Sequence, residues 1–259
     1  MFATGFLPEP DEDDNKHWSY EDTLKPGMAT LFTGPNVDLR PFSSPRQDQK
    51  ASSSCVAHAT VKALEIKRII EHGPENHVDL SRLAVYYLAR ELMFPPKTGK
   101  DSGTYISHAF DAMRRFGIPP ESDWPFDLDK VNSPPSWMAM RSAPGHKITS
   151  FFKIRSKGNA RVDEVVRCLQ AGNPVVYGTQ VGDEWFNYQV GQVLKLPVGT
   201  SSGHATVLVG FVNGLFVGEN SWGSSWGQEG FYLMDPSVIA NETSKDFWVC
   251  SATWETPAK

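Results

Sequence analysis

A single cysteine at the head of a long stretch with helical periodicity constrains the fold of this 259-residue chain more than any other feature. From Cys55 to Ile70, apolar residues recur every three or four positions, which predicts a buried or amphipathic helix over residues 55–72. Three serines stand just before the cysteine as candidate N-cap residues, and Gly73-Pro74 ends the pattern. Cys55 is therefore expected in the first turn of a helix, where the positive end of the helix dipole favours a thiolate.

Two segments far downstream carry the groups that a reactive thiolate needs, which are a base and a group that orients the base. His204 lies in a strand-like apolar run about 150 residues after Cys55, and Asn220 follows soon after in the run Asn-Ser-Trp-Gly. A cysteine followed at about this distance by histidine and asparagine is the spacing found in papain-type thiol proteases.

On these pieces together, the chain resembles the papain family of cysteine proteases, and most of all its bacterial, disulfide-free members. The pieces are Gln49 six residues before Cys55, the Gly-His-Ala strand around His204, and the run Asn-Ser-Trp-Gly-x-x-Trp-Gly from Asn220. The resemblance covers about residues 36–252. It implies an α+β, papain-like fold with a helical left half, a strand-rich, β-barrel-like right half, and the active-site cleft between them.

The resemblance also implies a role for each residue of the constellation. Cys55 would attack as a thiolate and carry a thioester intermediate, with His204 as acid and base. Asn220 would orient His204, and Trp222 would pack over their contact. Gln49 would supply one donor of the oxyanion hole and the Cys55 backbone N–H the other. The implied activity is that of a cysteine endopeptidase that uses no metal and no cofactor.

The same resemblance implies the substrate-binding positions. Ser102, Gly103 and Thr104 would form the left wall, which pairs with the substrate backbone and borders the S2 subsite. Ala205 would face S2, and Trp222 is counted with these residues.

Several positions of the cysteine loop depart from the usual family pattern. Lys50 stands where a glycine is usual after the glutamine, which affects the aim of the Gln49 amide. Ser53 replaces a glycine at the rim of S1. Ser52 stands where related enzymes of oxidising compartments carry a half-cystine, and the partner stretch around Asp101 has no cysteine either.

The chain divides into an extension and one catalytic domain. Residues 1–35 keep no helical or strand period, and they are interpreted either as a loosely attached tail or as a prosegment-like strap near the cleft. Residues 36–259 form the expected peptidase domain, helical over about 36–145 and rich in strands over about 146–259. Helices are expected at 55–72, 81–93, 104–116 and 160–171, and strands at 147–154, 174–181, 203–211, 215–219, 230–234 and 246–253.

Composition narrows the partners and the compartment. The net charge of −5 and the absence of a basic block argue against nucleic-acid binding, and no apolar run is long enough to span a bilayer. Of the three cysteines, Cys168 and Cys250 are interpreted as core residues. Without a disulfide framework or a visible secretory signal, we expect synthesis in the cytoplasm, with signal-independent export left open. The expected protein is a monomer that acts on peptide or protein substrates.

Alternatives to this interpretation stay open. His58 lies one turn after Cys55 on the same helix, but the spacing places it along the helix shaft, so it is interpreted as a packed histidine. An exopeptidase, an isopeptidase or an acyl transferase would use the same thioester. A catalytically silent papain-like binding protein is the alternative outside enzymes.

Overall fold

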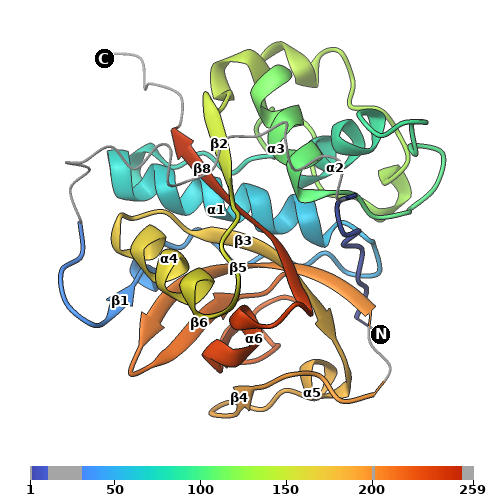
Figure 1. The fold of residues 1–259 in the computed structure, drawn as a ribbon. Helices are drawn as coiled ribbons and strands as arrows, with labels where there is room; N and C mark the ends of the chain where they lie inside the picture. Colours follow the sequence, from blue (N-terminus) through green and yellow to red (C-terminus); the bar gives the residue numbers. More distant parts are fainter. Residues whose placement is uncertain (1, 11–30, 200–201, 253–259) are drawn as a thin grey trace.

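The computed structural model describes residues 2–10, 31–199 and 202–252. They form an α+β fold in which helix α1 (Cys55–His72) runs between a helical part and a large sheet (Figure 1). All α1 side chains from Cys55 to Ile69 are buried, so this helix is the centre of the molecule rather than one of its faces.

The helical part packs two shorter helices against α1. They are α2 (Arg82–Glu91) and α3 (Ile106–Arg115), which lie above α1 in Figure 1. The hydroxyl of Ser81 accepts a hydrogen bond from Ala84 N at 3.1 Å and thereby caps α2. At α1, the expected serine cap is wrong, because the Ser54 hydroxyl pairs with His58 Nδ1 at 3.1 Å instead of a helix N–H.

The described strands form one mixed sheet in the order β2-β8-β3-β5-β6-β7-β4, with β1 paired to β5. The β-barrel-like half that the resemblance implies is therefore corrected to an open sheet in the parts that the structure describes. Its end strands are β2 and the two-residue β4, which pair only with β8 and β7, so no closure occurs. The bounds are β1 (Val37–Asp38), β2 (Ser150–Ile154), β3 (Val175–Val181), β4 (Val193–Leu194), β5 (Ser202–Val212), β6 (Leu215–Glu219), β7 (Phe231–Met234) and β8 (Ser244–Ala252).

Three helices accompany the sheet: α4 (Gly158–Gln170), α5 (Asp183–Phe186) and α6 (Pro236–Ala240). With them, each helix and strand expected from the sequence is found, with ends shifted by up to three residues. The hairpin predicted at Asn213-Gly214 joins β5 to β6, and Asn213 adopts the positive φ of 52° that such a turn requires.

Residues 2–10, called the strap below, pass in front of the first turn of α1 (dark blue in Figure 1). The strap pairs with Thr104 on the α3 side and with Gly203 of β5 on the sheet side. The acidic run at residues 11–14 and the aromatic residues 18 and 20 lie outside the described residues. Farther along, Phe32 N donates to Gln170 O at 3.0 Å, which fixes the chain to the end of α4.

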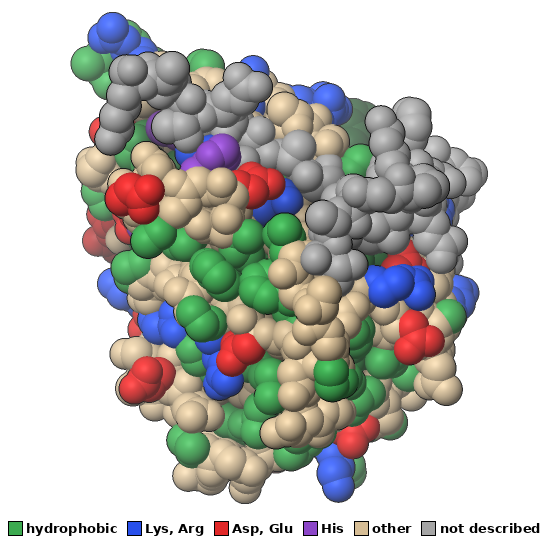
Figure 2. Space-filling view, turned by 90° about the vertical axis from the view of Figure 1, so that its left-hand side faces the viewer, with side chains coloured by type: hydrophobic (Ala, Val, Ile, Leu, Met, Phe, Trp, Pro, Cys, Tyr) green, Lys and Arg blue, Asp and Glu red, His purple; other side chains and the backbone are tan. Residues whose placement is uncertain are grey.

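The surface and the cysteines agree with the composition. On the coloured atoms of Figure 2, acidic and basic side chains alternate and no patch of one sign dominates. Cys168 and Cys250 are buried and take part in no disulfide among the described residues, which confirms them as core residues. Among the helices within the described ranges, none has the length and apolarity to cross a bilayer.

Candidate active site

The first turn of α1 and the start of β5 bring Cys55 and His204 to one place. The two elements pack directly on each other, and Ala205 N donates a hydrogen bond to Cys55 Sγ at 3.4 Å. Since Ala205 is the neighbour of His204 in the strand, the sulfur lies beside the backbone that carries the imidazole. Cys55, His204 and Ala205 are all fully buried.

His204 is held by Asn220 on one side and by an indole on the other. Its Nε2 lies 2.8 Å from Asn220 Oδ1, which also accepts Ser221 N at 2.8 Å and so fixes which way the amide faces. Nε2 is therefore the protonated nitrogen, and Nδ1 has no hydrogen-bond partner among the described residues. The Trp222 ring lies 4.7 Å from the imidazole, as the resemblance implies.

Gln49 is fixed so that one N–H of its amide faces the cleft. Its Oε1 accepts the Ser221 hydroxyl at 2.6 Å, and its Nε2 donates to Ser52 O at 2.8 Å. The second donor of Nε2 points to the carbonyl of Ala3 in the strap, at 3.1 Å. Lys50 adopts a φ of 53°, a conformation natural to the glycine usual at this place, so the loop tolerates the substitution at the cost of some backbone strain.

The strap fills the site from end to end. The Ala3 carbonyl accepts from both Gln49 Nε2 and Trp222 Nε1, the latter at 3.2 Å. The Gly5 backbone hydrogen-bonds to the Cys55 sulfur. Phe6 N donates to Gly203 O, and Leu7 N donates to Thr104 O, both at 3.2 Å. The pairing of Phe6 with Thr104 is parallel.

Close packing leaves no space for a larger residue at the centre of the strap. A Cβ added to Gly5 would lie 2.0 Å from Ser53 O, so any side chain there must lift the strap. The Phe6 ring lies directly over Gly178 of β3 and is 6% exposed. Both contacts depend on a residue without a side chain.

The remaining sequence-predicted residues divide into two groups. Gly103 and Thr104 lie against the strap, and Thr104 N donates to Gly5 O at 3.1 Å. The hydroxyl of Ser102 instead faces backbone oxygens of its own loop, at 3.4 and 3.5 Å. The cleft wall therefore includes Gly103, Thr104, Ala205 and Trp222, whereas the Ser102 hydroxyl makes no hydrogen bond to residues 2–10 of the strap.

Burial under the strap opposes the charged pair that the helix dipole alone would favour. It raises the pKa of the Cys55 thiol to about 12, although the N–H groups of Ala205 and Gly5 act in the other direction. Burial lowers the pKa of His204 to about 4, against the effect of Asn220. The expectation of a depressed thiol pKa is therefore wrong for the covered state, in which the pair is a neutral thiol and a neutral imidazole.

The sequence did not predict a role for the side chains of Asp101 and Tyr86, which fix both rims of the cleft. The Asp101 carboxylate accepts Ser53 N at 2.9 and 3.0 Å and the Tyr86 hydroxyl at 2.5 Å. The same hydroxyl accepts Gly103 N at 2.9 Å. These bonds tie the cysteine loop to the next loop, where related enzymes of oxidising compartments have a disulfide. Ser52 at the half-cystine position, together with the absence of a cysteine around Asp101, was the sequence signal that another tie is needed.

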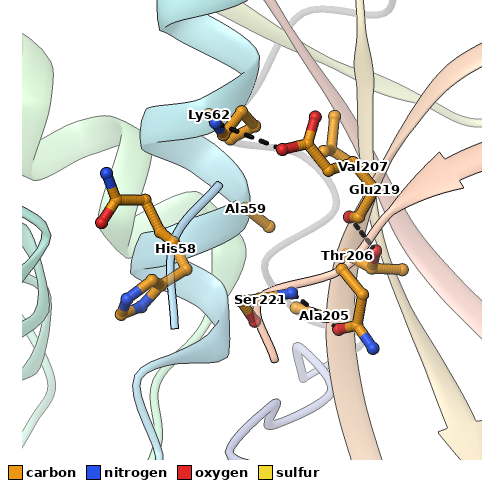
Figure 3. A pocket seen from close by; sticks show the side chains of 10 residues that line it. His58, Ala59, Lys62, Ala205, Thr206, Val207, Glu219 and Ser221 are labelled. Carbon is orange, nitrogen blue, oxygen red and sulfur yellow. Dashed lines mark hydrogen bonds and ion pairs between the residues drawn. The ribbon is translucent and has the colours of Figure 1, made fainter. Parts of the chain in front are cut away.

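A buried ionic network lies behind the site (Figure 3). Lys62 of α1 reaches Glu219 Oε1 at 3.2 Å, and Glu219 directly precedes Asn220 in the chain. A cavity of about 10 Å³ lies between α1 and the strands β5 and β6, and His58 and Thr206 are among the residues that line it. His58 is 3% exposed and packs edge-on against Phe126, which confirms it as a packed histidine. Lys62 within a buried helix was the sequence signal for this network.

One cluster among the described residues has the donor types of a metal site. Ligand atoms of Glu65, His77 and Asp79 lie within 4.8 Å of one another. The guanidinium of Arg82 already pairs with both carboxylates, at 2.6 Å for Glu65. Because this cation already pairs with both carboxylates, the arrangement carries no argument for a metal.

Comparisons with known proteins agree with this geometry. The family profile described as "Papain family cysteine protease" matches residues 34–247. The chain is 27% identical to xylellain, a cysteine protease from Xylella fastidiosa, with a TM-score of 0.81 over 96% of each chain. It is also similar to procathepsin B S9 from Trypanosoma congolense, at 16% identity and a TM-score of 0.71 over 98% of this chain and 87% of that one, a likeness of fold alone.

Relatives by sequence point the same way. An uncharacterized peptidase C1-like protein of Acanthamoeba polyphaga mimivirus is 28% identical over 93% of this chain and 84% of its own length. Germination-specific cysteine protease 1 of Arabidopsis thaliana is 25% identical over 78% of this chain, which spans about half (51%) of the plant protein. With a profile match over most of the sequence and the fold to go with it, this chain belongs to the papain family of cysteine proteases.

Proposed function

We propose that the protein is a thiol endopeptidase whose nucleophile is Cys55, held inactive by its own N-terminal strap. One observation carries the proposal: His204 is fixed by Asn220, its Nδ1 has no hydrogen-bond partner in the part of the chain that the structure describes, and the next residue in the strand bonds to the Cys55 sulfur. The peptidase domain is assigned to residues 36–259, with residues 1–35 as the extension, in keeping with the profile match from residue 34.

The reaction follows from the positions of these groups. With the strap displaced, water and substrate reach the pair, and the Sγ proton moves to His204 Nδ1. The sulfur then adds to the carbonyl carbon of the peptide bond, and the oxygen takes up the negative charge. His204 Nδ1 returns the proton to the departing amine, which leaves a thioester on Cys55. Water, deprotonated by His204, hydrolyses this thioester and regenerates the thiol.

Donors for the oxygen are indicated by the strap itself. The Ala3 carbonyl accepts Gln49 Nε2 and Trp222 Nε1, so this spot already holds a carbonyl oxygen of a peptide. We assign Gln49 Nε2 and the Cys55 backbone N–H as the oxyanion hole. The strap escapes attack because it presents the Gly5 N–H to the sulfur, a donor rather than an electrophilic carbon.

The length of the strap favours an endopeptidase over an exopeptidase. On one side of Cys55, Phe2 stacks on Trp222 with ring centroids 4.6 Å apart. On the other side, the strap continues past Phe6 to Glu9, which pairs with Lys153. The cleft thus accommodates a peptide chain on both sides of Cys55, as cleavage within a chain requires. A silent binding protein is disfavoured because each reacting group is present.

Covalent labelling tests the proposal. Full-length protein and the variant Gly5→Val, whose strap cannot dock, are treated with a peptidyl epoxide and analysed by intact mass and peptide mapping. We expect one adduct, on Cys55, formed faster in Gly5→Val, whereas buried Cys168 and Cys250 stay unmodified. Absence of an adduct on Cys55 in both proteins would contradict a nucleophilic role.

Docking of the strap is expected to weaken as the pH rises through about 7. Burial, followed by the neighbouring Asp246 carboxylate, raises the pKa of Glu9 from 4.5 to about 7 in the docked state. The docked strap therefore binds a proton that the free strap releases, and its stability falls as pH climbs through the docked pKa.

The alkylation rate of Cys55 measures this effect. At each pH, the wild-type rate is divided by the rate of Gly5→Val, which cancels the pH dependence of the thiol. The lower this ratio, the stronger the protection by the strap. We expect the protection to decrease several-fold between about pH 6 and pH 8. Glu9→Gln, which cannot titrate, serves as the control and should give a flat ratio. A wild-type ratio independent of pH would contradict the role of Glu9.

A further inference from the structure

One strap residue is held by a pocket that belongs entirely to the body of the protein. The Glu9 side chain is 2% exposed. Its Oε1 accepts Ser107 N and Trp248 Nε1, both at 3.0 Å, and its Oε2 lies 3.2 Å from Lys153 Nζ. All three of these partners are hydrogen-bond donors.

The three donors come from three elements that are held rigidly by the fold. Ser107 lies in the first turn of α3, where free N–H groups and the helix dipole favour an acid. Trp248 lies fully buried in β8, and Lys153 of β2 is directly opposite it in the sheet register. None of these positions depends on the strap, so the pocket remains when the strap leaves.

The pocket also recognises the backbone of the residue that it binds. The Glu9 N–H donates to Asp246 Oδ2 at 2.9 Å, and Asp246 Oδ1 pairs with Lys153 at 3.2 Å. An adjoining cavity of about 160 Å³ is lined by five cations, Lys153, Arg155, Lys157, Arg161 and Lys245, and, apart from Glu9 itself, by the two acids Glu242 and Asp246, so its rim is net positive. Such a rim attracts an acidic residue and repels a basic one.

The place of this pocket along the cleft gives it a substrate position. From Gly5 at the sulfur, the strap passes Gly103 and Thr104 before it reaches the pocket. The stretch 103–104 borders S2 by resemblance, so the pocket lies beyond S2 on the acyl side. Phe6 pairs with Thr104 at the border of S2 and therefore marks position P2. Glu9 follows Phe6 by three residues, about 10 Å in an extended chain, which corresponds to substrate position P4 or P5.

We propose that Ser107, Trp248 and Lys153 form a subsite for an acidic side chain at P4 or P5 of the substrate, which Glu9 occupies while the strap is docked. The assignment rests on the proposed function, since it names a substrate class for that cleft. Lys153 is its specificity-determining residue, because it supplies the positive charge, and without it Asp246 is left as the nearest charge.

The first test compares peptides on the full-length protein. Fluorogenic peptides share phenylalanine at P2 and carry glutamate, alanine or lysine at P4 and then at P5. The strap competes with all of them equally, so the ratio of their kcat/KM values reports the subsite alone. We expect glutamate to exceed alanine about tenfold at one of the two positions, and lysine to be poorest.

Variants identify the responsible cation. Lys153→Met should abolish the preference for glutamate and raise the lysine peptide above the alanine peptide, because Asp246 is then unpaired. Lys157→Met removes the same charge from the same rim, but it is Lys153 and not Lys157 that pairs with Glu9, so this variant should keep the preference. Equal kcat/KM for glutamate and alanine, or loss of the preference in both variants alike, would overturn the assignment.

A second test needs no catalysis and separates this proposal from the peptidase assignment. Full-length Glu9→Ala has the pocket vacant, and we expect a lower Tm than in wild type. Propionate at pH 6, below the raised pKa of the bound carboxyl group, should restore part of the difference, and it should restore less at pH 8. Propionamide and ethylammonium should not act, and Glu9→Ala with Lys153→Met should not respond. If no peptide is hydrolysed but propionate raises the Tm of Glu9→Ala, the peptidase assignment is rejected and the acidic subsite is supported. An equal effect of propionamide, or none from propionate, rejects an acidic subsite.

Discussion

Replacing Cys55 by alanine is expected to abolish peptide hydrolysis, with a loss in kcat of about 10³-fold or more, because the thioester cannot form. The fold should survive, since alanine is a strong helix former and fits the space that the thiol fills at the start of α1. Loss of the buried sulfur should lower the stability by about 1 kcal/mol. The measurement is hydrolysis of a fluorogenic peptide by Cys55→Ala in the Gly5→Val background, with Tm from circular dichroism.

Cys168→Ala is the matched control. Cys168 is equally buried, in α4, and its loss removes the same atom from the core without touching the cleft. It should cost similar stability and leave kcat within about twofold. Residual activity of Cys55→Ala near that of its parent would show that another group performs the reaction.

Removal of the strap is expected to raise kcat/KM by about tenfold or more, with most of the change in KM. Substrate and strap compete for the same donors, which are Gln49 Nε2, Trp222 Nε1 and the backbone of Thr104. Competition of this kind raises the apparent KM and leaves kcat unchanged. The comparison uses the full-length protein, a variant that starts at Asn36, and full-length Gly5→Val, in which the added side chain collides with Ser53 O.

Gly145→Val controls for the substitution itself. A Cβ at Gly145 meets no atom within 4 Å, so this variant adds the same volume away from the cleft and should behave as wild type. Equal kcat/KM for the wild type, the truncated form and Gly5→Val, with all three folded, would mean that the strap does not limit access.

The sequence predicts those parts of the site that depend on local pattern or on spacing along the chain. The helix from Cys55, the strand around His204 and the turn at Asn220 each have a local signal, and their separation points to one active site. Their meeting in space follows from the resemblance, and the structure brings them together. The open sheet was not predicted, because closure depends on the pairing of its end strands, for which a single strand pattern holds no information.

The strap was predicted only as a possibility, for a physical reason. Its contacts are mostly backbone hydrogen bonds and packing on Gly5, which require no periodic side-chain pattern. Glu9 is bound by donors from three elements, and their convergence appears only in the folded chain. The raised pKa of Cys55 has the same origin, because the burial that causes it is produced by the strap and not by the helix.

The strap and the cleft belong to one covalent chain, and this determines how the block responds to concentration. A tethered ligand acts at a fixed local concentration, of the order of mM for short flexible connections. Diluting the protein therefore cannot relieve the block, in contrast to an inhibitor supplied by another molecule. Relief comes from substrate, whose half-saturating concentration is raised by a factor set by the local concentration of the strap and by its affinity. Under the proposed function, such an enzyme turns over scarce peptides slowly and approaches its full rate only where substrate is abundant.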